Sequence, residues 1–189
     1  MSRTFSSLSI RNYRNFFFGN CASFIGVWMT RTAQSWLVLA ELTHGDATAL
    51  GWLTSAMFLP TMLLTPIAGS FADRFPKRTI MLSAQTLLLI DIVILAVLTL
   101  TGHVQLWHVF VLALLDGVAG AFDNPSRQAT VTELVPAGEV SNAIGLNATS
   151  FNTARLVGPG AAGLLIAAIG TGPVFVVNAF TIVFQMLSL

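Results

Sequence analysis

The stretch Gly69–Arg78, with the sequence GSFADRFPKR, places one acid and three bases between two long apolar runs. A charged segment this short between two apolar runs predicts a tight turn that joins two membrane helices. Because cytoplasmic loops retain Lys and Arg, the bases place this turn on the cytoplasmic side. We expect Pro76 in the first turn of the second helix, where its missing N–H costs nothing. Asp73 is expected just before that helix, where free N–H groups and the helix dipole favour a carboxylate.

The composition indicates an all-α membrane protein. Of its 189 residues, 54% are hydrophobic and only 9% are charged, and the mean hydropathy is +0.77. A soluble domain carries about 25% charged residues. The single cysteine, Cys21, excludes an internal disulfide and a Cys-rich metal site. We therefore expect one integrated bundle in the lipid bilayer, with no cofactor, no metal and no nucleic-acid partner.

Apolar runs predict six transmembrane helices, because a bilayer requires ~20 residues per span. The spans cover roughly residues 16–40, 50–72, 79–100, 104–122, 142–169 and 174–189. Residues 1–15 are polar and basic and predict a cytoplasmic interfacial segment, so the bundle itself comprises residues 16–189. Residues 123–141 are polar and predict a longer cytoplasmic loop. The last span is short, and we expect the chain to be cut off inside or just after it.

The loop charges predict the orientation of this bundle. Seven basic residues fall in segments assigned to the cytoplasm, and none falls in the three segments assigned to the outside. The seven are Arg3, Arg11, Arg14, Arg74, Lys77, Arg78 and Arg127. Since Lys and Arg accumulate in cytoplasmic loops, the N-terminus is expected in the cytoplasm, and the protein in the inner or plasma membrane of the cell.

The charged turn resembles the loop between helices two and three in the major facilitator superfamily of transporters. The family pattern is Gly, three residues, Asp-Arg, one residue, Gly and two bases. The matching residues are Gly69, Asp73, Arg74, Lys77 and Arg78, and Pro76 stands where the family usually has Gly. The resemblance implies one half of a transporter fold, with six helices in two inverted three-helix repeats (3+3). It also implies a missing C-terminal half, or a second copy of this chain, as partner.

Two later stretches, residues 123–136 and 142–159, resemble the branch of this superfamily that includes siderophore and macrolide exporters. The segment GPGAAG at 158–163 resembles the Gly-Pro element in helix five of the family's antiporters. Small residues let helices approach closely, so Gly158, Pro159 and Gly163 are expected to form a helix-packing motif. The resemblance implies export of a small drug-like or siderophore-like molecule, with a proton as a coupling ion. Ala113 stands where many drug–proton antiporters carry an Arg, so proton coupling rests on the family alone.

Ionisable residues inside a membrane span are costly and indicate functional sites. Four occur here, and a rise of 1.5 Å per residue places Arg31 and Arg155 ~22 Å and ~20 Å from the cytoplasmic end, near the midplane. Asp91 falls at ~18 Å and Asp116 at only ~9 Å, so Asp116 could instead face the basic turn. We interpret Arg31, Gln34, Asp116 and Arg155 as candidates for a cavity wall or for ion coupling. For Asp91 and Arg155, a structural ion pair between helices is an equally good interpretation.

The charged turn is also predicted to act as a conformational latch. In this hypothesis Asp73 pairs with Arg74 or Arg78, and Asp116 or Asp123 supplies a second carboxylate from the fourth span. The latch set comprises Gly69, Asp73, Arg74, Lys77, Arg78 and Asp123. Such a cluster stabilises one conformational state if the other state lacks its contacts.

Other classes of function fit the sequence less well. An intramembrane serine protease needs a Gly-x-Ser-Gly motif, which does not occur, so the chain is not expected to be an enzyme. Residues 158–163 also match the dinucleotide fingerprint G-x-G-x-x-G, but they lie inside an apolar helix and follow no strand. A non-transporting half-protein that binds or regulates a partner stays open as the alternative to a transporter of small molecules.

Overall fold

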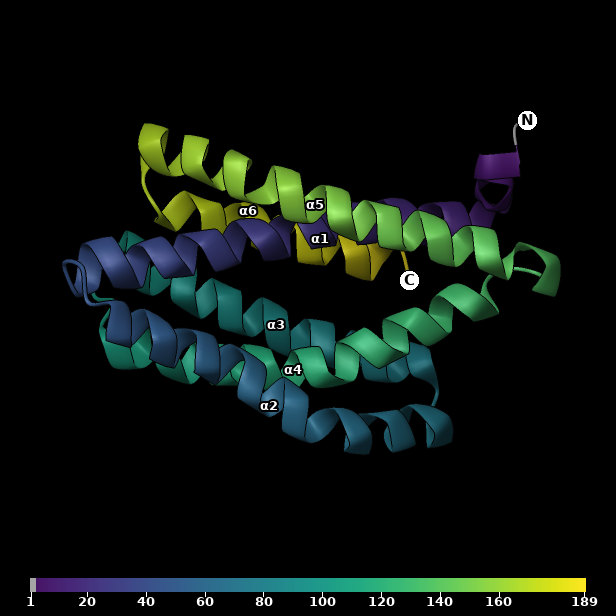
Figure 1. Ribbon diagram of the computed structural model, residues 1–189, viewed down its shortest axis with the longest axis horizontal. Helices are drawn as coiled ribbons and strands as arrows, with labels where there is room; N and C mark the ends of the chain where they lie inside the picture. The colour runs from purple at the N-terminus through teal and green to yellow at the C-terminus, as the bar shows by residue number, and fades with distance from the viewer. Residues whose placement is uncertain (1–2) are drawn as a thin grey trace.

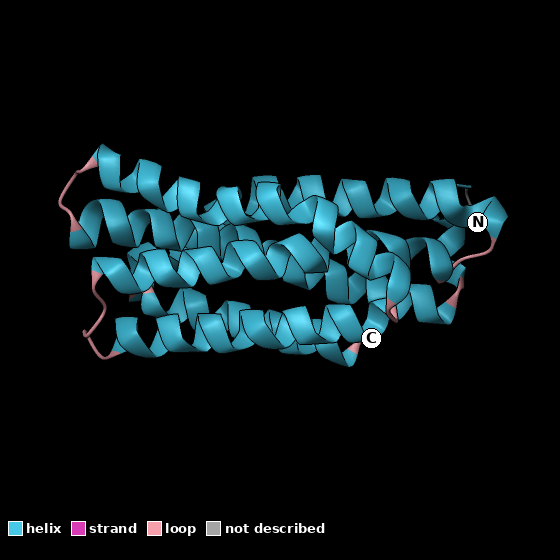
Figure 2. Cartoon of the chain, turned by 90° about the horizontal axis from the view of Figure 1, so that it is seen from below, coloured by secondary structure: helices cyan, strands magenta, loops and turns pink. Residues whose placement is uncertain are grey.

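The computed structural model describes residues 3–189, apart from the side chains of residues 3, 4, 72 and 73. This part of the chain is built from helices. The long ones are α1 (Arg11–Trp36), α2 (Ala47–Arg74), α3 (Lys77–Leu100), α4 (Leu106–Glu133), α5 (Val140–Ile169) and α6 (Gly172–Leu187). The short ones are the 3-10 helices η1 (Arg3–Ser9) and η3 (Ala137–Glu139) and the π-helix η2 (Leu37–Leu42), which continues α1. All six long helices follow one long axis (Figures 1 and 2).

The six helices form two groups of three. Figure 1 shows α1, α5 and α6 on one side of the bundle and α2, α3 and α4 on the other. Within the groups, α1 packs against α5 and α6, and α4 packs against α2 and α3, while α3 and α6 join the two groups. The main apolar core lies between them and includes Leu37, Leu53, Leu95, Val109 and Phe175, each at most 1% exposed.

The turns divide between the two ends of the bundle. Consecutive helices alternate in direction, so the turns after α1, α3 and α5 lie at one end (Figure 1). The N-terminal segment and the turns after α2 and α4 lie at the other end. This second end carries the exposed basic residues Arg11, Arg14, Arg74 and Arg78.

Four of the described helices are long and apolar enough to cross a membrane. They cover Ala47–Phe71, Lys77–Leu100, Leu106–Glu133 and Ala137–Ile169. α6 is apolar but has only 16 residues. α1 is long enough, but it buries the polar residues Asn20, Ser23 and Gln34. Large apolar side chains such as Met62, Leu156 and Leu164 are 74–81% exposed on the outer faces, which suits contact with lipid.

Two predicted boundaries around the turns are wrong. The loop predicted for residues 123–141 is largely helix, because α4 continues through Pro125 to Glu133. The charged pair Asp123 and Arg127, which suggested a solvated loop, is instead buried one helical turn apart. α2 also continues to Arg74, so Asp73 lies in its last turn and not just before α3, whose N-cap is Pro76.

The predicted interfacial segment is shorter than expected. α1 begins at Arg11, so only Arg3–Ser9 precedes it as a separate element. This element packs on the start of α5, where Ser6 donates a hydrogen bond of 2.5 Å to Glu139. The Ser7 hydroxyl likewise donates to Asn142 at 2.5 Å. The N-terminal segment is therefore held against the α4–α5 connection.

Candidate functional site

A cavity of ≈ 830 Å³ lies between the two groups of helices and is lined by α1, α2, α4 and α5. Ligand pockets in proteins occupy about 300–1,000 Å³, so the cavity can hold a small organic molecule. Asp116, Gly120 and Asp123 line one wall, as their i, i+4, i+7 spacing on α4 requires. Asp116 therefore faces the cavity, where it lies within electrostatic range of Arg31.

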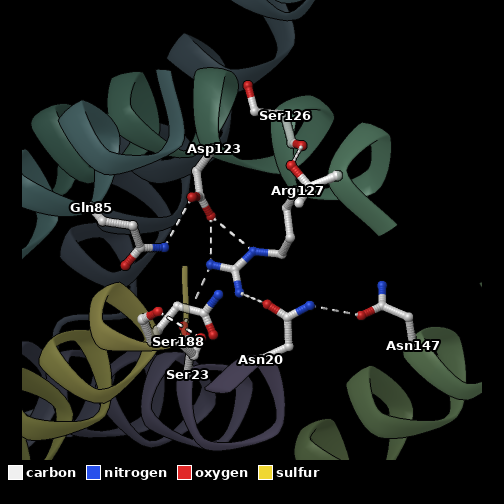
Figure 3. A network of polar contacts seen from close by, with 10 residues as sticks. Asn20, Ser23, Gln85, Asp123, Ser126, Arg127, Asn147 and Ser188 are labelled. Atoms are coloured by element: carbon white, nitrogen blue, oxygen red, sulfur yellow. Dashed lines mark hydrogen bonds and ion pairs between the residues drawn. The ribbon is translucent and has the colours of Figure 1, made fainter. Parts of the chain in front are cut away.

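A buried ion pair joins Asp123 and Arg127 in this wall (Figure 3). Nη2 of Arg127 lies 2.7 Å from Oδ2 of Asp123, and Nε lies 3.1 Å from the same oxygen. The other oxygen, Oδ1, accepts a hydrogen bond of 2.9 Å from Nε2 of Gln85 on α3. A buried charge is tolerated when it is paired and hydrogen-bonded in this way. Both oxygens of Asp123 are therefore used within the bundle.

The same arginine ties α4 to the opposite group of helices. Nη1 of Arg127 donates to Oδ1 of Asn20 at 2.5 Å, and the Asn20 amide donates to Oδ1 of Asn147 at 3.1 Å. Arg127 also lies over the ring of Phe24, 5.1 Å from its centroid. The network thus connects α1, α3, α4 and α5 (Figure 3). Sequence reasoning missed it, although the i, i+4 spacing of Asp123 and Arg127 was a usable signal.

The predicted cavity residues do not all reach the cavity. Arg31 lines it, with its guanidinium 5.0 Å from the Trp28 ring centroid and 5.2 Å from that of Phe58. Gln34 is only 2% exposed and lies in the bundle interior, outside the cavity wall. Arg155 is exposed on α5, also outside the wall, and lies over Trp28 at 5.5 Å.

A structural ion pair at Asp91 or Arg155, one of the two interpretations of these residues, does not form among the described residues. The two ion pairs found there are Lys77–Glu133 and Asp123–Arg127. Asp91 is 4% exposed, and its Oδ1 is buried without a hydrogen-bond partner in the described part of the chain. Its carboxylate lies in the bundle and not in the cavity wall.

The turn residues make fewer contacts than the latch hypothesis requires. Lys77 forms an ion pair with Glu133 at the end of α4, while Arg74 and Arg78 are exposed. Asp123 is held by Gln85 and Arg127 and not by the bases of the turn. The Asp73 side chain lies outside the described residues.

The Gly-Pro motif contains one close helix contact. A Cβ built on Gly158 would lie 2.6 Å from Cβ of Trp28 and 3.3 Å from the carbonyl oxygen of Ile25, both on α1. Only glycine allows α5 to approach α1 this closely. A Cβ on Gly163 would meet nothing within 4 Å, so Gly163 makes no close helix contact among the described residues, and its packing role stays a prediction. α5 runs as one helix through Pro159.

The comparison with known proteins adds the family. The sequence profile of the family described as "Transmembrane secretion effector" matches residues 2–189. The chain belongs to this family of major facilitator transporters. A staphyloferrin A transporter of Staphylococcus aureus is 28% identical over 166 residues, which cover 87% of this chain and 41% of that protein. Members of this superfamily are transporters of small molecules and not enzymes.

Two further relatives of this secretion-effector chain are efflux proteins. The multidrug efflux pump Tap of Mycolicibacterium fortuitum is 31% identical over 150 residues, 77% of this chain and 36% of the pump. Macrolide efflux protein A of Streptococcus pyogenes is 25% identical over 127 residues, 67% of this chain and 31% of that protein. The chain therefore spans well under half the length of these curated relatives.

Proposed function

We propose that this chain is part of a secondary active transporter that exports a small organic molecule by alternating access. The observation that carries the proposal is the cavity between the two groups of helices. Its size suits a small ligand. Arg31 and Asp116 in its wall are charges inside membrane helices, and such charges mark substrate or ion pathways. The efflux relatives favour export over uptake.

The packing of the helices supports two inverted repeats of three helices. If α1, α2 and α3 are exchanged with α4, α5 and α6, the main packing pairs map onto one another. The pair α2–α4 becomes α5–α1, α3–α4 becomes α6–α1, and α3–α6 maps onto itself. The exchanged helices run in opposite directions (Figure 1). This is the relation between the inverted repeats that build many transporter halves.

The distribution of charge supports six spans with the N-terminus in the cytoplasm. The membrane is proposed to be the inner or plasma membrane of the cell. The exposed basic residues at the start of α1 and beside the α2–α3 turn lie at the same end of the bundle. Lys and Arg accumulate on the cytoplasmic side. In this orientation α1 and α6 also cross the membrane, packed against the four more apolar helices.

Alternating access requires two halves that move about a site at their interface. We infer that the partner is a C-terminal half of the same transporter or a second copy of this chain. A proton is the proposed coupling ion, with Asp116 as its candidate carrier because that carboxylate faces the cavity. The turn residues Gly69, Asp73, Arg74, Lys77 and Arg78 are proposed to latch one conformation, through Lys77 and Glu133 on the α4 side.

Reconstitution in liposomes tests this function. The 189-residue chain and the complete transporter are inserted separately, their oligomeric states are measured, and release of a trapped substrate is followed under a proton gradient. We expect gradient-driven release by the complete transporter or by a dimer, and none by a monomer of this chain. Gradient-driven transport by a demonstrated monomer would refute the requirement for two halves. A complete transporter without flux of any tested molecule would favour a regulatory half-protein.

A further inference from the structure

The guanidinium groups of two arginines lie over the ring of Trp28 on α1. The guanidinium of Arg31 lies 5.0 Å from its ring centroid, and that of Arg155 lies 5.5 Å away. Phe151 on α5 packs edge-on against the same ring, with centroids 5.8 Å apart, and the Phe58 ring on α2 also lies close to Arg31. Two positive charges are thus concentrated around one aromatic cluster that joins α1, α2 and α5.

Neither arginine forms an ion pair with a carboxylate in the described part of the chain. The two ion pairs among the described residues use other side chains, and the buried Nε of Arg31 has no hydrogen-bond acceptor there. Aromatic rings attract a guanidinium only weakly, by about 0.5–2 kcal/mol. An arginine inside a membrane span is costly without a partner. An anion that enters from outside the bundle would compensate the charge of Arg31.

The negative charges of the cavity do not meet this need. Asp123 is neutralised by Arg127, which leaves Asp116 as the remaining acid of the wall. No hydrogen bond or ion pair joins Asp116 to Arg31 among the described residues. Arg31 and Asp116 are the charges of the wall that form no ion pair among the described residues, and Arg155 adds a positive charge outside the wall, over Trp28. The apolar part of the wall includes three aromatic rings, those of Phe24 and Phe151, which are in edge-to-face contact at 5.3 Å, and that of Phe58.

We propose that the cavity binds organic anions with an apolar body, with the carboxylate on Arg31 and the apolar body against Phe24, Phe58 and Phe151. The proposal deepens the function given above and rests on it, because it names the substrate class of the same cavity. Arg31 can hold a carboxylate through two parallel N–H donors. A hydrogen-bond donor elsewhere on the ligand would meet Asp116.

Three probes that share one apolar body test the charge preference. Pyrenebutyrate is an anion, pyrenebutyramide is neutral and pyrenebutylamine is a cation. Binding to the purified chain in an uncharged detergent is followed by the anisotropy of pyrene fluorescence. We expect the anion to bind about tenfold more tightly than the amide, because a hydrogen-bonded charge pair contributes a binding free energy of this size. The amine should bind no better than the amide.

Variants then assign the preference to Arg31. Arg31→Gln should reduce anion binding to the level of the amide, whereas Arg14→Gln, at an exposed site outside the cavity, should leave it unchanged. Arg31→Lys keeps the charge and should keep most of the preference, which preserves the test if the Gln variant misfolds. Asp116→Asn should strengthen anion binding, because it removes a like charge. Equal binding of all three probes, tighter binding of the amine, or an unchanged preference in Arg31→Gln would overturn the proposal.

Two further measurements distinguish a soluble anionic substrate from a lipid headgroup, and anion binding from transport. Phosphatidylglycerol and a soluble aryl carboxylate are compared as competitors of pyrenebutyrate. If the lipid displaces the probe equally well, Arg31 binds a lipid headgroup, and the proposal of a soluble substrate is overturned. The binding assay needs no transport. Anion binding by the chain, together with no flux by the complete transporter or by a dimer in liposomes, would refute the transporter function and leave the anion site intact. Flux of cations, together with no preference for the anionic probe in the binding assay, would support the transporter function and refute the anion site.

Discussion

Asp123 and Arg127 face each other one turn apart on α4, with Nη2 and Oδ2 2.7 Å apart and side chains only 6% and 5% exposed. The pair lies where the sequence suggested a solvated loop. Its hydrogen bonds connect four helices, and the pair is also part of the cavity wall. Loss of one partner should therefore lower the free energy of unfolding.

Arg127→Met should lower the free energy of unfolding by about 3–5 kcal/mol, because it leaves a buried carboxylate uncompensated. The double variant Asp123→Leu, Arg127→Met should be clearly less destabilised than the sum of the single variants, since it removes both charges. Denaturant unfolding of the chain in detergent, followed by circular dichroism, measures these differences. Strictly additive effects in the double-mutant cycle would show that the two charges do not stabilise each other.

The ion pair Lys77–Glu133 should contribute little to stability. Its side chains are 28% and 56% exposed, and ion pairs exposed to this degree are worth about 0–1 kcal/mol. Glu133→Gln should therefore change the unfolding free energy by less than about 1 kcal/mol, and added salt should reduce the difference. A loss as large as that of Arg127→Met would mean that the α2–α3 turn is a main support of the fold.

The glycines of α5 should respond in opposite ways to a methyl group. Gly158→Ala places a Cβ 2.6 Å from Trp28 and 3.3 Å from the Ile25 carbonyl, so it should separate α5 from α1 and destabilise the chain. Gly163→Ala meets nothing within 4 Å and should stabilise the helix by roughly 0.5–1 kcal/mol. Thermal unfolding of the two variants compares them directly. Equal effects at both positions would contradict the close contact at Gly158.

The proposed topology predicts the side from which each end can be labelled. Cys21→Ser removes the single cysteine, and His44→Cys or Lys77→Cys then introduces one at either end of the bundle. A membrane-impermeant maleimide should label position 44 from outside intact cells and position 77 only after the membrane is opened. Labelling of both positions from the same side would refute the six-span arrangement.

The long helices could be predicted from the sequence because each apolar run is separated from the next by a short polar turn. The end of α4 could not, because composition alone does not distinguish a solvated charge from a buried pair such as Asp123 and Arg127. The i, i+4, i+7 spacing of Asp116, Gly120 and Asp123 agrees with their common position in the cavity wall. Gln34, expected at the cavity, lies three residues from Arg31; this rotates its side chain by about 60°, which is enough to turn it into the bundle.

The rest of the site depends on contacts between segments far apart in the chain. Arg127 meets Asn20 across 107 positions, and Asp123 meets Gln85 across 38, only through the fold. No periodicity within one helix specifies which polar residues of other helices will meet. The contact of Arg31 with Phe58 is of the same kind, because Arg31 lies on α1 and Phe58 on α2.

The way the two helix groups interlock also has a consequence for how the chain is made. α2 has little contact with α3 and packs mainly against α4, while α1 packs mainly against α5 and α6. When only α1, α2 and α3 have been synthesised, most of the helices against which they pack in the finished bundle are therefore still missing. Insertion into the bilayer must precede tertiary assembly, and the bundle closes only when the second half of its own sequence emerges.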